Sequence, residues 1–386
     1  MKRPSEQAVL AATFPLSGVA TTMLGPLLPA LVGRWLLTDA QAGQLFLAQF
    51  LASTFGAICS AWIVARAGIP RSIGGAYALM GTAILILDLV PRAAVLLVIA
   101  GYGFMLGVSI PAVNVAASLR SPGREMAQLN LLNTAWCLGA VLAPPAIVSL
   151  SRAAGMGAVL ALIGALCLLS GAACLLFLER TIVTHLAAGE RPKIGKTIRR
   201  AAVATGLFLF LYVGVENGLN GWMPLLAQRT HAGTNTGAAA LSVFWAAILL
   251  SRLMAGLLSG QRESRIWLRS GLVLATLGVA AVIAFQRMPA LFLLGSAAAG
   301  LGMGPLFPTA VALFHARAGA ASERLMGLVF AASGCGGGAL PWLIGLISSA
   351  TGSLRIGLAV ALAALAGMIF VQVRADYTTS FRTSKP

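Results

Sequence analysis

The chain has 386 residues, of which 59% are hydrophobic and only 10% are charged, and its mean hydropathy is +0.90. Ordinary soluble domains carry about 25% charged residues, so this composition excludes a soluble globular protein. The net charge of +17 would suit a nucleic-acid-binding protein, but the positions of the basic residues, described below, argue against that class.

Apolar runs of about 20 residues follow one another along the whole chain, and each is long enough to cross about 30 Å of hydrocarbon as a helix. The sequence predicts twelve such helices. In chain order they lie at 8–32, 40–65, 72–90, 93–119, 127–150, 156–178, 201–227, 237–260, 266–286, 290–314, 325–350 and 354–373. The predicted fold class is therefore an all-α membrane protein with twelve transmembrane helices.

The loops on the two sides of the predicted membrane differ in charge. Of the 27 Lys and Arg residues, 20 fall in the two terminal segments and in the loops on the same side as the termini, and Arg252 falls within a helix. The loops of the opposite side hold one arginine each, namely Arg34, Arg92, Arg152, Arg229, Arg287 and Arg355. Basic loops stay in the cytoplasm, so we expect a multi-pass protein of the bacterial inner membrane with both termini cytoplasmic.

The five cysteines and three histidines show no arrangement typical of a metal site. The cysteines all lie in predicted helices without ligand spacing, and the histidines lie in loops or at helix ends. These residues are Cys59, Cys137, Cys167, Cys174, Cys335, His185, His231 and His315. We therefore expect no metal and no cofactor.

The two halves of the chain resemble each other at an offset of about 197 residues. The matched pairs are Gly103 with Gly300, Gly107 with Gly304, Pro111 with Pro308, Gly139 with Gly336, Pro144 with Pro341 and Gly155 with Gly352, and Pro26 matches Pro224 one residue further on. Such a repeat predicts two pseudo-symmetric six-helix bundles of the same orientation, an architecture typical of transporters. The expected bundles are 1–178 and 201–386, joined by a cytoplasmic linker at 179–200.

With this helix count, repeat and central loop, the whole chain resembles the major facilitator superfamily. After the second helix, "ARAGIPRS" at 65–72 is similar to the inner-loop signature of that superfamily. Arg66, Gly68 and Arg71 match the signature, whereas Ala65 stands where an Asp is usual. The resemblance implies the major facilitator fold and a gating role for the three matching residues.

Three further segments resemble the fucose permease branch of sugar-proton symporters. They are "NVAAS" at 114–118, "LNLLNTAWCLGA" at 129–140 and "FWAAILLSRLMAG" at 244–256, and they include Asn114 and Asn130, which recur in that branch. This resemblance implies a sugar as the solute and protons as the coupled ion.

Glu216 lies in the middle of the predicted helix 201–227, about 23 Å from its cytoplasmic start. An acid at this depth is expensive, and by default it indicates a functional site that faces a cavity or the bundle interior. Tyr212, Glu216 and Asn220 are spaced by four and share a face, with Asn217 beside them. We expect Glu216 to load and release a proton. Alternatively, it only holds a helix loosened by the glycines of "NGLNGW".

Arg252 falls about eight residues from the cytoplasmic end of its helix, too deep to reach the interface comfortably. Three roles are open. It can bind helix-end carbonyls as part of an inner gate, contact an anionic substrate, or pair with Glu216, which lies about 10 Å higher along the membrane normal. A gating or packing role is favoured.

Amides and aromatic side chains are concentrated on the helices expected to surround a central cavity. The candidate substrate-binding residues are Gln49, Asn114, Asn130, Asn133, Trp136, Tyr212, Asn217, Asn220, Trp222, Trp245 and Phe307. Amides donate and accept hydrogen bonds, and aromatic rings offer flat apolar faces, so this set favours a neutral polyhydroxylated ligand. Alternatively, the amides join helices to one another, at about 0.6 kcal/mol per hydrogen bond.

The sequence therefore predicts a monomeric, proton-coupled secondary transporter of a monosaccharide or related polyol that works by alternating access. A proton-driven drug or metabolite exporter remains an alternative, because "GAVLAPP" at 139–145 is similar to the helix 5 signature of drug-proton antiporters. An uncoupled facilitator and a non-transporting sensor also remain open. An enzyme is disfavoured, because the chain shows no paired acids, no nucleophile with its base and no metal ligands.

Overall fold

The computed structural model describes residues 6–120, 123–179, 194–230, 232–258, 264–319 and 321–383, with backbone alone for 126, 323, 324 and 375–383. These residues form helices and no strand. The helices are α1 Glu6–Thr22, α2 Leu24–Trp35, α3 Asp39–Ala67, α4 Ile69–Ile86, α5 Val95–Leu119, α6 Glu125–Phe177, α7 Lys196–Arg229, α8 Thr234–Leu258, α9 Ser264–Ala284, α10 Pro289–Met303, α11 Leu306–Ala318, α12 Ala321–Thr351 and α13 Leu354–Thr383, with a short 3-10 helix, η1, at Arg92–Ala94.

The described helices make up the twelve predicted spans. Ten helical segments are long and apolar enough to cross a membrane, and α1 with α2, bent by 45°, forms another. Helix α6 has 53 residues, more than twice the length that one span needs. Gly155 divides it into two spans, because its φ of 85° and ψ of 167° reverse the chain. Gly352, its counterpart in the repeat, also has a positive φ, of 69°.

Matched glycines of the repeat also make matched helix contacts. A Cβ atom on Gly139 of α6 would lie 2.1 Å from the carbonyl oxygen of Pro15 in α1. A Cβ atom on Gly336 of α12 would lie 1.9 Å from the carbonyl oxygen of Phe210 in α7. Only glycine permits helix backbones to approach this closely, so the predicted repeat is confirmed in the packing.

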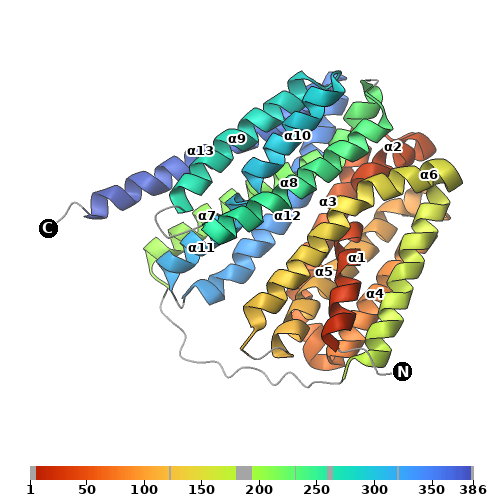
Figure 1. The fold of residues 1–386 in the computed structure, drawn as a ribbon, viewed down its shortest axis with the longest axis horizontal. Coiled ribbons are helices and arrows are strands. Elements are labelled where there is room, and N and C mark those ends of the chain that lie inside the picture. The colour runs from red at the N-terminus through yellow and green to blue at the C-terminus, as the bar shows by residue number, and fades with distance from the viewer. Residues whose placement is uncertain are drawn as a thin grey trace.

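The two bundles lie side by side, α1 to α6 in red to yellow and α7 to α13 in green to blue (Figure 1). Within them α3 packs on α5, α4 and α1 on α6, α7 on α12, and α9 and α8 on α10. The bundles touch through α3 with α12, α6 with α8, and α2 with α7. Most of the predicted linker 179–200 lies outside the described residues.

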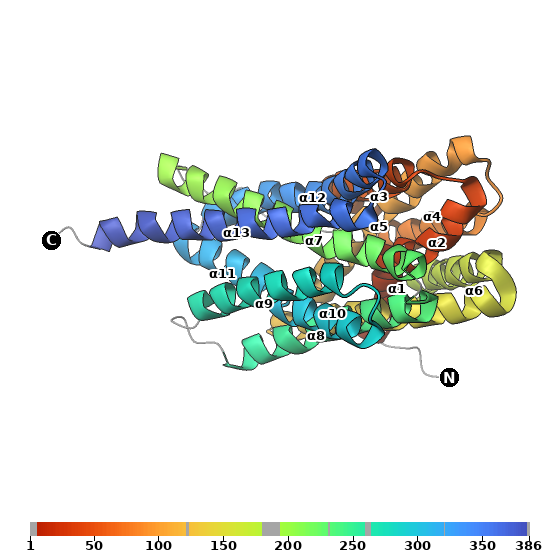
Figure 2. The same ribbon diagram turned by 90° about the horizontal axis from the view of Figure 1, so that it is seen from above.

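The two ends of the molecule differ. One end, called the Asp39 end, contains the start of α3, the end of α7, the start of α8 and the end of α12; the other, the Glu6 end, contains the start of α1. In Figure 1 the bundles converge toward the Asp39 end, near α2, and diverge toward the Glu6 end. In Figure 2 α13 and the first turns of α7 project beyond their bundle at the Glu6 end.

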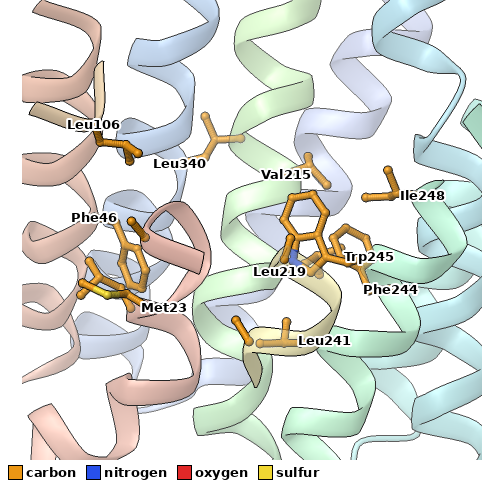
Figure 3. Packing of buried hydrophobic residues seen from close by; sticks show 14 of the residues in the cluster. Met23, Phe46, Leu106, Val215, Leu219, Leu241, Phe244, Trp245, Ile248 and Leu340 are labelled. Carbon is orange, nitrogen blue, oxygen red and sulfur yellow. The ribbon is translucent and has the colours of Figure 1, made fainter. Parts of the chain in front are cut away.

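Apolar side chains fill the space between the helices. Figure 3 shows Val215 and Leu219 of α7 directed toward Phe244, Trp245 and Ile248 of α8, and all five are buried. Between helices in a membrane such packing acts mainly through van der Waals contact. It fixes α7 against α8, the two helices that carry Glu216 and Arg252.

Several predicted element boundaries need correction. The predicted helix 8–32 is interrupted at Met23, and 290–314 is interrupted between α10 and α11. The predicted helices 127–150 and 156–178 are continuous with each other except at Gly155, and 72–90 is α4, Ile69–Ile86. Hydropathy locates spans but carries no signal for a bend within one.

Candidate functional site

Glu216 lies in the interior of the C-terminal bundle, with 8% of its surface exposed. The helix that carries it is not loosened, because α7 runs unbroken through "NGLNGW". The glycines there serve close packing instead. A Cβ atom on Gly221 would lie 2.7 Å from the ring of Phe46, which belongs to the other bundle. The alternative that Glu216 holds a loosened helix is therefore not supported by the continuous α7.

Glu216 forms a three-residue cluster with Tyr212 and Arg252. The Tyr212 hydroxyl donates to Glu216 Oε1 at 3.0 Å. Arg252 Nη2 lies 3.1 Å from Tyr212 Oη and 3.4 Å from Glu216 Oε1. Of the three roles left open for Arg252, the pairing with Glu216 is present, since the arginine side chain spans the offset between the two residues. Buried charge is thus neutralised inside the bundle.

Arg252 also reaches a helix break in the same bundle. Its Nε donates to the carbonyl oxygen of Gly304 at 3.2 Å, at the junction of α10 and α11. In an α-helix this carbonyl would accept from the N–H of residue 308, but Pro308 has none. The contact of Arg252 with a helix-end carbonyl, another of the three alternatives, is therefore present alongside the ion pair.

The cluster faces the other bundle. The guanidinium of Arg252 lies within electrostatic range of the thiol of Cys137 on α6. Beside Cys137, Trp136 of α6 packs edge-on against Trp245 of α8, with ring centroids 5.4 Å apart. Glu216 and Arg252 thus lie close to the interface between the bundles, where a transported solute has to pass.

Three predicted ligand contacts are occupied by protein groups. Asn220 donates to the carbonyl oxygen of Thr22 at 3.3 Å and accepts from Trp245 Nε1 at 3.0 Å. Trp222 Nε1 donates to the carbonyl oxygen of Pro341 at 2.9 Å. Asn220, Trp222 and Trp245 are all buried, so in this structure they join helices.

Three other predicted amides keep a free acceptor. Gln49 donates to the carbonyl oxygen of Thr21 at 3.1 Å, and Asn217 donates to that of Val213 at 2.9 Å. The side-chain oxygens of Gln49, Asn217 and Asn114 are buried and accept no hydrogen bond from the described residues. A buried acceptor without a donor is unfavourable, so each of these oxygens suits a water molecule or a ligand hydroxyl.

The remaining candidates lie nearer the Glu6 end. Asn130 and Asn133 are exposed on α6, and Trp136 is half-buried. Phe307 lies between Tyr212, with ring centroids 5.7 Å apart, and Phe330, on which it stacks at 6.0 Å. This aromatic row extends from the Glu216 cluster along α11 and α12.

The residues that match the inner-loop signature lie where α3 meets α4. Gly68 has a φ of 78° and links the two helices. The exposed Arg66 stacks over the ring of Trp62, with its guanidinium carbon 4.3 Å from the ring centroid, and Arg71 is also exposed. Arg66, Gly68 and Arg71 therefore lie at the Glu6 end of the N-terminal bundle.

Sequence reasoning missed an ion pair that joins the bundles at the Asp39 end. Arg229 donates from both terminal nitrogens to the Asp39 carboxylate, at 2.6 and 2.7 Å, and the Ser348 hydroxyl donates to the same group at 2.5 Å. We call these three residues the Asp39 latch. The sequence did offer one signal for this ion pair: Asp39 directly follows Thr38, which begins a helix with a capping box, and the chain has only 10 acidic residues.

Other contacts between the bundles lie near the latch. The backbone N–H of Ala40 donates to Ser349 Oγ at 2.8 Å. Arg152 donates to Asn235 Oδ1 at 2.5 Å and also to Thr234 Oγ1. The Asp39 end is therefore closed by polar contacts that cross from one bundle to the other.

Comparisons with known proteins agree with this architecture. A model of the Major Facilitator Superfamily matches residues 10–281. Among solved structures, a bacterial homologue of the human lysosomal transporter Spinster, in an inward-facing and unoccupied conformation, is similar at 15% identity and a TM-score of 0.77, covering 95% of each chain. A mutant of the nucleoside transporter NupG is similar at 13% identity and a TM-score of 0.77, covering 95% of this chain and 98% of that one. No curated protein gives a significant match. At these identities the solved structures show the fold alone.

Proposed function

The chain belongs to the Major Facilitator Superfamily and is a multi-pass membrane transporter, and we propose that it moves a small neutral solute, a monosaccharide or related polyol, by alternating access driven by protons that bind Glu216. The observation that carries the proposal is the buried Glu216 carboxylate, held by Tyr212 and Arg252 inside the C-terminal bundle, close to the interface with the other bundle. An acid in such a place is a functional site by default.

The proposed orientation puts the Glu6 end in the cytoplasm of a bacterium, because the basic loops lie on that side. The Asp39 end then faces outward. With the Asp39 latch formed and the bundles diverging toward the Glu6 end, this orientation supports an inward-facing state (Figure 1). Opening to the outside then requires the ion pair of Asp39 and Arg229 to separate.

The charge balance of the cluster supports the proposed proton coupling. The Glu216 carboxylate attracts the Arg252 guanidinium, and protonation of Glu216 removes that attraction. An exchange of protons at Glu216 therefore changes the position favoured by Arg252, which lies within electrostatic range of Cys137 of the other bundle. Protonation is thereby linked to the interface that alternating access has to rearrange.

The proposed solute class rests on the free amide oxygens of Gln49, Asn114 and Asn217. Hydroxyl groups are neutral hydrogen-bond donors that match such acceptors. The ring of Phe307, which packs against Tyr212, offers an apolar face. Since one solved structure of this fold is a nucleoside transporter, nucleosides belong beside sugars and polyols among the solutes to be tested.

The test is uptake of labelled solutes into proteoliposomes under an imposed pH gradient. We expect a sugar or polyol to accumulate against its gradient in wild type. The Glu216→Gln variant should lose accumulation yet retain exchange of labelled for unlabelled solute, because it binds solute but carries no proton. Accumulation that is unchanged in Glu216→Gln would overturn the role of Glu216, and movement of amphipathic drugs without any sugar effect would favour an exporter.

An uncoupled facilitator is the second candidate, and the ion pair itself favours it. A glutamate that is permanently neutralised by Arg252 is a structural group and exchanges no proton. Wild type would then equilibrate solute without response to the pH gradient, and Glu216→Gln would show the same exchange rate as wild type.

A further inference from the structure

The tenth span is interrupted where a carbonyl lacks its helical partner. Helix α10 ends at Met303 and α11 begins at Leu306. Between them the carbonyl oxygen of Gly304 would accept a helical hydrogen bond from the N–H of residue 308, but that residue is proline and has no N–H. Inside a membrane an unpaired carbonyl has to find another donor, and Arg252 Nε supplies it at 3.2 Å.

The same guanidinium of Arg252 also binds the carboxylate of Glu216. Arg252 uses Nε for Gly304 and Nη2 for Tyr212 and Glu216. One planar group therefore touches the ionisable site on α7 and the break in the tenth span. Lysine, with a single ammonium group, lacks the fixed fork that reaches both at once.

The N-terminal bundle supplies an internal comparison. Gly107 and Pro111 have the spacing of Gly304 and Pro308, yet α5 continues without interruption from Val95 to Leu119. The position of the repeat that corresponds to Arg252 is Phe55, which has no donor. The C-terminal bundle also has Pro305 where the N-terminal bundle has Val108, so the break occurs together with a second proline and with the arginine, in the bundle that holds the acid.

The groups around Arg252 leave one candidate for control of its position. Helix α7 contributes Glu216 and Tyr212, and the residue after α10 contributes the Gly304 carbonyl. The Cys137 thiol of α6 lies within electrostatic range. In the described part of the chain Glu216 is the only acid paired with Arg252. Binding of a single proton to Glu216 removes the negative charge that attracts Arg252.

We propose that Arg252 is a positioning residue that couples the charge on Glu216 to the break between α10 and α11. With Glu216 ionised, the guanidinium is shared between the carboxylate and the Gly304 carbonyl. With Glu216 neutral, it binds Gly304 more firmly and stiffens the break. Because α11 leads from the break to the Glu6 end, the protonation state of Glu216 sets the mobility of that part of the tenth span. The inference rests on the proposed role of Glu216 in proton coupling.

The test is hydrogen exchange of the backbone amides between Met303 and Thr309 in purified full-length protein. Four proteins are compared: wild type, Glu216→Gln, Arg252→Lys and the double variant. In the wild-type background Glu216→Gln should slow exchange at the break several-fold. In the Arg252→Lys background the same substitution should have no effect, because the fork that joins the two sites is gone. An equal effect in both backgrounds, or no effect in wild type, would overturn the proposal.

Arg229→Lys is the matched control. It alters another arginine that binds a carboxylate, but at the Asp39 end, and should leave exchange at 303–309 unchanged. If Arg252→Lys does not fold, wild type and Glu216→Gln are compared over a range of pH. The protection factor at the break, which is the exchange rate corrected for the intrinsic pH dependence of amide exchange, should depend on pH in wild type alone, and the same dependence in Glu216→Gln would refute the proposal. The measurement needs no solute, so a chain that fails to transport sugars would still show the exchange pattern.

Discussion

Proline residues account for several polar contacts inside the bundles. Pro26 frees the carbonyl of Thr22, which accepts from Asn220 of the other bundle at 3.3 Å. Pro145 likewise frees the carbonyl of Val141, and Ser242 Oγ donates to it at 2.7 Å, again across the interface. Asn220, which the sequence predicted to bind solute, thus donates to a backbone carbonyl that a proline leaves without its helical partner. Inside lipid such a carbonyl needs another hydrogen-bond donor.

Replacement of Asn220 tests this structural role. Asn220→Leu removes the donor to Thr22 and the acceptor of Trp245. At about 0.6 kcal/mol per hydrogen bond in membrane bundles, the free energy of unfolding should fall by roughly 1 kcal/mol. Thermal unfolding of the purified protein measures the loss. Asn133→Leu, at an exposed position on α6, is the control, and an equal loss there would contradict the assignment.

The buried ion pair predicts a non-additive pair of substitutions. Glu216→Ala leaves Arg252 without its acid and should destabilise the protein by about 3 kcal/mol, the lower part of the range for broken buried pairs, because Arg252 is 30% exposed. Combining it with Arg252→Met removes the unpaired charge and should restore most of that loss. Thermal unfolding of both single variants and the double variant gives the interaction energy. Additive effects would mean that the two groups do not interact.

The sequence indicated which residues are chemically important better than it indicated which residues they contact. The spacing of Tyr212, Glu216 and Asn220 placed them on one face of α7, and Arg252 was left with three possible roles. Which role it takes depends on the rotation of α8 against α7 and on the break at Gly304. Neither quantity is encoded in the spacing along one helix.

At the scale of elements, hydropathy predicted all twelve spans because each needs about 20 apolar residues, and that requirement is visible in any window of the chain. The bends are different. Pro26 and Pro308 coincide with breaks, whereas Pro111 lies inside the unbroken α5. A proline therefore indicates an unpaired carbonyl reliably, but whether the helix breaks depends on what surrounds that carbonyl.

A substitution in the tenth span tests this reasoning. Pro308→Ala returns an N–H to the Gly304 carbonyl, so this carbonyl should accept a helical hydrogen bond and Arg252 should lose its acceptor, while Pro305 stays in place. We expect higher thermal stability, by up to about 3 kcal/mol as the helix penalty of proline is relieved, together with slower transport. Unfolding temperature and uptake rate are measured together. Pro111→Ala, the counterpart in a helix that is already continuous, should change both far less, and equal changes in the two variants would contradict this account.

At the scale of the whole molecule, the closure of one end depends on residues far apart in the sequence. Asp39 and Arg229 belong to different bundles, and Ser348 comes from a third region of the chain. Each of them is an ordinary helix-end residue when considered alone. The internal repeat predicted two bundles of equal orientation, but not which of their ends would be joined in this state.

The Asp39 latch therefore predicts a shift between conformations. Asp39→Asn removes the charge that holds Arg229 and weakens the bond from Ser348. Since Arg229 is 40% exposed, we expect a modest change of roughly 1–2 kcal/mol, which raises the population open at the Asp39 end by about 5- to 30-fold. Spin labels at the exposed positions Leu36 and Thr351, on the two bundles, report this population as a longer distance. Arg34→Gln, which breaks the ion pair with Asp88 at the same end but inside one bundle, is the control. A shift in Arg34→Gln as large as that in Asp39→Asn would show that charge loss at this end, rather than the contact between the bundles, controls opening.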